Sequence, residues 1–412
     1  MDKQYFDNNQ CVGGFEVGGY DRNAIHPTDT NWTRQSRFGL PKNPKLRWSI
    51  VIPDAMLDET ECNPGFAVDS KGDILVADSD PLSMARSRGR LWRITKEGKK
   101  QIIFETNLRL RAPVIGEDGS IYIVNSLSVD ESVHRLFCLQ PTGEVKWIHK
   151  LEKTPVTKPV IDKDCNIYLY ICDEIEGTFL SIKKDGTLNW SKDFRGTING
   201  EPIISEEGII YLGYSAGKTY LCALKKDGEL LWEKQFNQGG MNSPFNINKK
   251  QEIFTIMDGK LVVCKNDGAI EWEYENHGPI KPPSFDAFGN IYMNVTPFSI
   301  VSLTAEGKER WLIEFSTFTA YFTTVDKDNN ILQICEEEKK NGDSTFLNAF
   351  TMKGEQLWKY ELEGIPQAAI LGDDQLIYVI TNRFRYEGLS STGDYDVDWI
   401  LYAIESKDTG GL

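Results

Sequence analysis

The stretch Ala223-Leu224-Lys225-Lys226-Asp227-Gly228-Glu229-Leu230-Leu231-Trp232 decides the fold of this 412-residue chain. Its Gly-x-x-x-Trp element returns at Gly143/Trp147, Gly186/Trp190, Gly268/Trp272, Gly307/Trp311 and Gly354/Trp358. Successive tryptophans are 43, 42, 40, 39 and 47 residues apart. A period of this size indicates a repeat architecture with one supersecondary unit per period.

A second element, an isoleucine followed by a large apolar residue, gives the number of units. The clear copies are Ile121-Tyr122, Ile167-Tyr168, Ile210-Tyr211, Ile253-Phe254, Ile291-Tyr292 and Ile377-Tyr378, and the weaker ones are Ile74-Leu75 and Ile331-Leu332. A proline opens the preceding strand at Pro113, Pro159, Pro202, Pro244 and Pro283. Each unit reads as four short strands, A to D, separated by turns rich in Asp and Gly. This pattern predicts an all-β, eight-bladed β-propeller.

The last blade lacks an outer strand of its own. Blade 8 starts near Ile365 and ends at residues 399–404, and no Gly-x-x-x-Trp follows. The segment Leu46–Val51 carries Trp48, and we expect it to supply the missing strand and close the ring. Blade 1, about residues 62–108, has Ile102 at the tryptophan position. We therefore predict one propeller domain over residues 45–412, preceded by an extension, residues 1–44, that could fold back as a lid or plug.

The repeat at residues 223–232 resembles the tryptophan-docking repeat of the PQQ-binding-like (quinoprotein alcohol dehydrogenase-like) propeller family. The resemblance covers about residues 45–405, and the segment from Phe38 to Trp48 also looks like the first strand of bacterial members. The family includes quinone dehydrogenases, outer-membrane assembly lipoproteins and soluble propellers, so the resemblance implies the fold and leaves the function open. The dehydrogenases carry a vicinal cysteine pair over their cofactor, which this chain lacks. PQQ is therefore not the expected cofactor, and a PQQ-dependent dehydrogenase remains an alternative.

Composition narrows the classes of partner. The net charge of -15 and the pI near 4.9 argue against nucleic acid, which requires a positive surface, and give no reason to expect an anionic membrane. No apolar run reaches the length of a transmembrane helix, and residues 1–9 lack the features of a signal peptide, so we expect a cytoplasmic protein. The eight cysteines form no CxxC motif, and we expect them to be reduced and mostly buried.

Loop length is concentrated in the connections between strands B and C. These loops are long at Asp78–Gly89, Asn125–His134, Asp173–Gly177, Glu336–Ser344 and Asn382–Asp398, whereas the A–B and C–D turns are tight. Long loops on a rigid scaffold commonly carry function. We therefore predict a site at the axial mouth on the face that holds the B–C and D–A loops.

The D–A loops bring carboxylates, an imidazole and cations to this mouth. A metal site would use Glu61, Glu201, His277 and His26, with zinc the first choice, and Glu201 and His277 would also be catalytic. An anionic substrate would be held by Arg111, Lys158, Lys281, Asn242 and Tyr321. A metal-bound water would supply the nucleophile. The sharpest prediction is thus a metal-dependent hydrolase of a small phosphoester.

A second function fits the same residues. Polar side chains at a propeller mouth are commonly solvated, and the chain contains no HExxH, Gly-x-Ser-x-Gly or P-loop motif. The alternative is therefore a non-catalytic propeller whose loop-rich face binds a protein or a small ligand.

Overall fold

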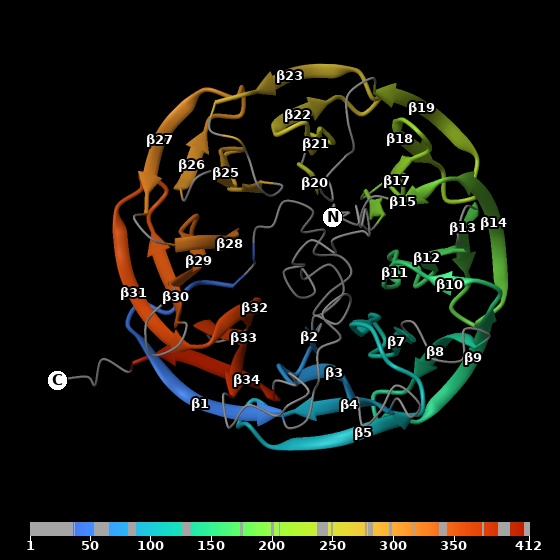
Figure 1. Cartoon of the computed structure of the whole chain (residues 1–412), viewed down its shortest axis with the longest axis horizontal. Helices are drawn as coiled ribbons and strands as arrows, with labels where there is room; N and C mark the ends of the chain where they lie inside the picture. Colours follow the sequence, from blue (N-terminus) through green and yellow to red (C-terminus); the bar gives the residue numbers. More distant parts are fainter. Residues whose placement is uncertain are drawn as a thin grey trace, which may run out of the picture.

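The fold is described by a computed structural model. It describes residues 36, 38–52, 66–80, 88–125, 133–173, 176–198, 202–205, 207–236, 246–248, 250–276, 278, 283–295, 299–315, 318–337, 344–372, 375–385 and 396–407. Within these ranges the regular secondary structure is β-strand, arranged in eight antiparallel sheets around one axis (Figure 1). None of the described segments is a helix of the length and apolarity needed to cross a membrane. The predicted eight-bladed propeller is confirmed.

Each blade has four strand positions, from A at the axis to D at the rim. Blade 1 consists of β2 (Phe66–Val68), β3 (Ile74–Asp80), β4 (Arg88–Ile94) and β5 (Lys100–Thr106), and blade 2 consists of β6 (Val114–Ile115), β7 (Ile121–Val124), β8 (His134–Leu139) and β9 (Val145–Leu151). Blade 3 consists of β10 (Thr154–Pro155) with β11 (Val160–Ile161) at position A, then β12 (Ile167–Cys172), β13 (Glu176–Ile182) and β14 (Leu188–Arg195). Blade 4 consists of β15 (Thr197–Ile198) with β16 (Ile203–Ile204) at position A, then β17 (Ile210–Ser215), β18 (Thr219–Leu224) and β19 (Leu230–Phe236). Blades 5 to 7 are β20 (Asn246–Ile247), β21 (Ile253–Met257), β22 (Lys260–Cys264), β23 (Ile270–Tyr274); β24 (Ser284–Phe285), β25 (Ile291–Val295), β26 (Ser299–Leu303), β27 (Glu309–Glu314); and β28 (Phe318–Val325), β29 (Ile331–Glu337), β30 (Ser344–Phe350), β31 (Gln356–Glu363).

Blade 8 joins the two ends of the chain. It consists of β32 (Ile365–Gly372), β33 (Leu376–Arg385), β34 (Asp396–Ser406) and the N-terminal strand β1 (Pro44–Ile52). Trp48 of β1 pairs with Ala403, as Trp232 pairs with Ala223 within blade 4. The predicted closure and the eighth tryptophan position are therefore confirmed. Ile102 pairs with Trp92 at the same register, which confirms its place in blade 1.

The outermost strands follow the circumference, and each points toward the next blade (Figure 1). This direction lets the tryptophan of one blade reach the C–D turn of its neighbour. The indole N–H of Trp190 donates to the carbonyl oxygen of Lys226 at 2.7 Å, and that of Trp48 donates to Lys96 at 2.8 Å across the closure. Trp147, Trp232 and Trp311 make the equivalent bond at 3.0, 2.7 and 3.1 Å.

The glycine of the repeat lies directly against the docked indole. Gly228 has a φ of +85°, and a Cβ at this position would lie 2.9 Å from Cδ2 of Trp190. The glycine therefore serves both the backbone conformation and the close approach of the ring. In blades 2 to 6 and in blade 8 the aromatic residue of strand B lies against the indole of the blade's own outer strand, as Tyr211 does against Trp232 with ring centroids 6.1 Å apart.

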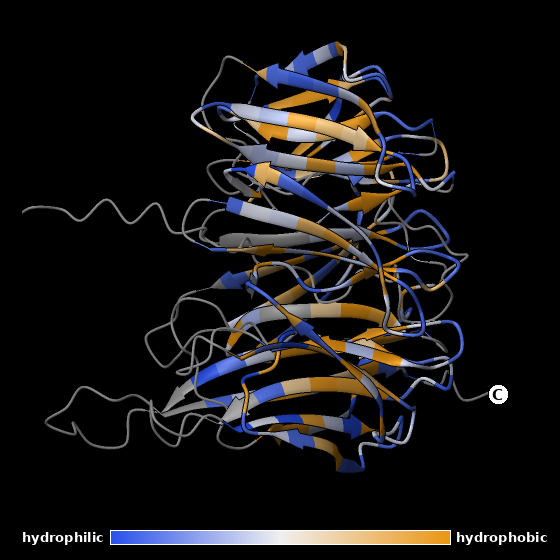
Figure 2. Cartoon of the chain, turned by 90° about the vertical axis from the view of Figure 1, so that its right-hand side faces the viewer, coloured by the Kyte–Doolittle hydropathy of each residue, from blue (hydrophilic) through white to orange (hydrophobic). Residues whose placement is uncertain are grey.

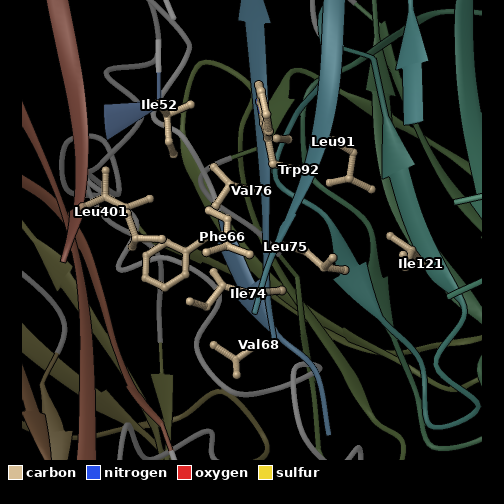
Figure 3. Packing of buried hydrophobic residues seen from close by; sticks show 14 of the residues in the cluster. Ile52, Phe66, Val68, Ile74, Leu75, Val76, Leu91, Trp92, Ile121 and Leu401 are labelled. Atoms are coloured by element: carbon tan, nitrogen blue, oxygen red, sulfur yellow. The ribbon is translucent and has the colours of Figure 1, made fainter. Parts of the chain in front are cut away.

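The core continues from blade to blade. One cluster takes Phe66, Val76 and Leu91 from blade 1, Ile121 from blade 2 and Leu401 from blade 8 (Figure 3). In the side view the strands carry most of the apolar residues, and the turns at one end are hydrophilic (Figure 2). The six cysteines within the described residues are buried and form no disulfide, as expected; Cys11 and Cys62 lie outside them.

A short strap precedes β1. The backbone N–H of Ser36 donates to the carbonyl oxygen of Val325, and the N–H of Leu40 donates to Oδ2 of Asp326 at 2.9 Å. Leu40 packs into the core shared by blades 7 and 8. The blue segment in Figure 1 accordingly leads from the inner side of the ring, between these blades, to β1. The strap is a second contact, besides the pairing of β1 with β34, that holds the N-terminal segment in the closed ring. The sequence analysis did not predict it.

The docking contact predicts a difference between two glycines. Gly217 has a similar φ of +71°, but a Cβ there would meet nothing within 4 Å. We expect Gly217→Ala to lower the free energy of unfolding by about 1–2 kcal/mol, the cost of a left-handed backbone. Gly228→Ala should lose a further 1–3 kcal/mol, roughly, because its methyl group overlaps the Trp190 ring. Urea unfolding of both variants measures this, and equal losses would contradict the docking contact.

Candidate functional site

The two faces of the ring are built differently. On one face, called the turn face, the A–B and C–D connections within the described residues are tight turns, such as 162–166 and 225–229. On the other, the loop-rich face, the B–C connections range from the two residues Asp258 and Gly259 to residues 386–395. The predicted concentration of loop length on one face is confirmed by these strand bounds. Four of the loops are shorter than predicted, because the flanking strands extend into them: the loops comprise residues 81–87, 173–175, 338–343 and 386–395.

The A–B turns of the turn face resemble one another because a side chain in the turn accepts hydrogen bonds from backbone N–H groups of the same turn. Oδ1 of Asp162 accepts from the backbone N–H groups of Asp164 and Asn166, both at 2.9 Å, and its Oδ2 accepts from Tyr168 Oη at 3.1 Å. Asp286 repeats these bonds in blade 6. Such Asx turns hold the backbone locally without help from another segment. The turn face therefore consists of closed turns.

Most predicted site residues cannot be placed. Those that lie outside the described residues are Glu61, Glu201, Asn242, His277, Lys281 and His26. Arg111, Lys158 and the backbone of Tyr321 are described. Arg111 leads into the innermost strand of blade 2, Lys158 into that of blade 3, and Tyr321 lies in blade 7.

Arg111 is held by a short pairing that precedes β6. Leu110 forms an isolated bridge with Asn125, and the N–H of Arg111 donates to the carbonyl oxygen of Val124 at 2.9 Å. Leu110 is buried against Gly89 of blade 1. Arg109 and Arg111 stand on either side of Leu110 in the sequence, and both residues are half-buried.

Lys158 lies where the innermost strand of blade 3 is interrupted. β10 and β11 both pair with β12, and residues 156–159 separate them. The hydroxyl of Thr157 accepts from the backbone N–H of Tyr170 at 3.0 Å and so replaces a ladder bond. The Thr157 side chain thereby stabilises the interruption between β10 and β11. Lys158 lies in this interruption, half-buried, on the loop-rich side of β11.

Tyr321 occupies an irregularity in β28. Ala320 pairs with Cys335 and Phe322 with Ile334, so Tyr321 is the extra residue of a bulge. Gln367 of β32 has the same position between Pro366 and Ala368. Bulges redirect side chains and are frequent beside functional sites. The innermost strands of blades 7 and 8 thus share a feature that periodicity alone could not reveal.

The metal prediction remains a prediction. Among the described residues no three His, Cys, Asp or Glu side chains form a group that could hold a metal ion. All four predicted ligands lie outside those residues. The thiols of Cys138 and Cys222 are unsuited to such chemistry, because burial raises the pKa of Cys138 to about 11 and that of Cys222 to about 12.

A buried ion pair near the loop-rich end of blade 1 escaped the sequence analysis. Nε and Nη2 of Arg90 donate to Oδ1 and Oδ2 of Asp78 at 2.9 and 2.8 Å. The indole N–H of Trp92 also donates to Oδ2 of Asp78 at 2.8 Å. Both charged residues are buried. The available signal was Asp78, the first polar residue of β3 after four apolar ones, and this network lies just before the loop at residues 81–87.

Two histidines at the seam of blades 2 and 3 play different parts. Nδ1 of His149 lies 2.8 Å from the carbonyl oxygen of Gly186, so this side chain joins the outer strand of blade 2 to the C–D turn of blade 3. His134 is buried at the start of β8, where Nε2 lies 3.3 Å from Oγ1 of Thr154. Its Nδ1 is buried and makes no hydrogen bond.

The ion pair of blade 1 predicts a large effect on stability. Asp78→Ala leaves the Arg90 charge buried without its partner carboxylate, and we expect the free energy of unfolding to fall by about 3–5 kcal/mol. The neighbouring pair Arg88–Glu105 is exposed, so Glu105→Ala should cost about 1 kcal/mol or less. Thermal and urea unfolding compare the two variants. A loss at Asp78 no larger than at Glu105 would show that the buried pair is not a structural brace.

Solved structures share this architecture. BamB from Moraxella catarrhalis has a TM-score of 0.54 at 12% identity, covering 87% of this chain and 99% of its own. The C-terminal WD40 domain of Sif2 has a TM-score of 0.57 at 11% identity, covering 88% of this chain and 99% of its own. The Dos1 propeller has a TM-score of 0.54 at 10% identity, covering 92% and 98%. At these identities the likeness shows the fold alone.

Sequence comparison gives a family. No curated protein matches the chain. The family model PQQ_2, described as outer membrane protein assembly factor BamB, matches residues 176–385, from strand C of blade 3 to strand B of blade 8. That match spans just over half of the chain and includes five Gly-x-x-x-Trp elements, from Gly186/Trp190 to Gly354/Trp358. The chain belongs to the PQQ_2 family of β-propeller proteins.

Proposed function

We propose that this protein is a binding scaffold whose loop-rich face holds a protein partner. The observation that carries the proposal is the contrast between the two faces. The turn face repeats one closed geometry, with backbone groups bonded inside each turn. The other face holds the connections whose lengths differ from blade to blade. Loops that vary on a rigid frame are the usual place for recognition.

The described cations give this face a preference for acidic groups. Arg109, Arg111 and Lys158 lie on the loop-rich side of blades 2 and 3 in a chain of net charge -15. Local positive charge on an acidic protein steers and orients an anionic group. We therefore expect the partner to present carboxylates to this part of the face. A small anionic ligand would use the same cations.

The family supports contact with proteins. Its description names an assembly factor, and assembly is accomplished through contacts between proteins. A BamB and a WD40 domain are among the structures with the same fold. The metal-dependent hydrolase and the PQQ-dependent dehydrogenase have no such support, and zinc binding remains a prediction.

Site-specific photocrosslinking in cells of the source organism tests the face. A photoreactive amino acid at Glu176 or Lys218 samples exposed positions on the loop-rich face. The same amino acid at Lys163 or Phe288 samples the turn face and serves as the matched control. We expect discrete adducts from the first pair only. Adducts from Lys163 and Phe288 alone, or equally from all four positions, would reject the loop-rich face as the binding surface.

Metal analysis separates the scaffold from the hydrolase. We expect purified protein to contain no stoichiometric zinc, manganese or calcium, and its melting temperature to be unchanged after dialysis against chelator. A scaffold gains no stability from a metal, whereas a bound ion stabilises the folded state by mass action. About one tightly held transition metal per chain would favour the hydrolase over the scaffold.

A further inference from the structure

The innermost strands of blades 7 and 8 each carry an extra residue. In blade 7, Tyr321 is extra between two residues that pair with Ile334 and Cys335, which are neighbours in β29. In blade 8, Gln367 is the extra residue of β32 at the corresponding place. Such a residue is left out of the ladder, and the strand that contains it bends. Both axial strands therefore leave the regular pairing at one point.

The innermost strands of blades 2 and 3 have the same kind of irregularity. In blade 2, residues 111–113 face only residues 123 and 124 of β7. In blade 3, residues 156–159 face only residues 169 and 170 of β12. Thr157 supplies a side-chain acceptor for one backbone N–H group of β12, so this break in the ladder is compensated from within.

The four irregularities lie at one level of the ring. Each falls opposite the second to fourth residue after the repeat isoleucine of strand B. Strand B begins at the turn face, so this level lies toward the loop-rich end of the innermost strands. In Figure 1, β10 and β11 lie across the axis from β28. In the other four blades, part of this level lies outside the described residues.

The irregular segments of blades 2 and 3 each contain a cation. Arg111 and Lys158 belong to these segments, and both residues are half-buried. Irregular strand segments redirect side chains, which allows long side chains on adjacent axial strands to serve one ligand. The extra residues of blades 7 and 8 are a tyrosine and a glutamine, residue types that donate hydrogen bonds to carboxylates. The set is therefore suited to a ligand that carries several carboxylates.

We propose that the extra residues form an axial binding site for an extended acidic segment of the protein partner. The segment enters from the loop-rich face, and its carboxylates contact Arg111 and Lys158. An extended segment fits because the level lies on the innermost strands, whereas a folded surface would meet the B–C loops first. The inference rests on the proposed function, since it assumes a protein partner on that face.

Binding of a defined peptide to the full chain tests the site. The probe is a fluorescently labelled peptide of eight glutamates, with a peptide of eight glutamines as its uncharged control, followed by anisotropy at low ionic strength. We expect Lys158→Gln and Arg111→Gln each to raise the Kd of the glutamate peptide about ten-fold, because each removes a charge-assisted hydrogen bond. Lys218→Gln removes the same charge from an exposed position on the loop-rich face, and it should change the Kd by about two-fold or less.

Lys158→Arg keeps the charge and should bind the glutamate peptide as the unsubstituted chain does, which separates a lost contact from a folding defect. Equal Kd values for the two peptides, or equal losses in Lys158→Gln and Lys218→Gln, would overturn the axial site. So would the absence of peptide binding. If photocrosslinking at Glu176 or Lys218 still gave discrete adducts, that failure would concern the axial site alone and leave the scaffold standing.

Discussion

The contact between an outer-strand tryptophan and the turn glycine of the next blade, made at six of the eight seams between blades in the described residues, is the constraint on which the structure depends. It joins neighbours by an indole hydrogen bond and by a ring that leaves no space for a side chain, as at Trp190 and Gly228. Because blades dock on their neighbours at both sides, the two end blades of an open row would each lack a docking partner. Only a closed ring gives every blade a neighbour on both sides. Trp48 docks over Gly98 and makes that closure, which places the N-terminal strand in the last blade.

Uniform docking also divides the molecule into two faces. The docking glycines are in the C–D turns, so these turns must keep one geometry, and the A–B turns beside them are fixed by their own Asx caps. Within the described residues, no glycine on the other face lies against an indole of a neighbouring blade. These connections can therefore differ in length without disturbing the docking contacts, and they are where we propose that recognition occurs.

The sequence predicted the fold well because the docking contact leaves a local signature. Each Gly-x-x-x-Trp element marks the C–D turn and the outer strand of one blade. Eight tryptophan positions, one of them occupied by Ile102, therefore locate every blade. The strap, the bulge at Tyr321 and the Asp78–Arg90 pair were not predictable, because each depends on segments brought together by the closed ring. Of the candidate site, the structure places Arg111 and Lys158 ahead of the innermost strands β6 and β11, on the loop-rich side, and Tyr321 inside β28 rather than in the preceding loop; their roles stay predictions.

The central claim is that the ring is closed by β1 as firmly as the other blades are joined. Native-state hydrogen exchange of the amides in Trp48–Ile52, paired with residues 399–403, tests it most directly. If closure is part of the global structure, these amides exchange only on global unfolding, with the same free energy as amides of β12 or β17. Exchange of β1 at a much lower free energy, with the other blades still protected, would contradict a closed ring.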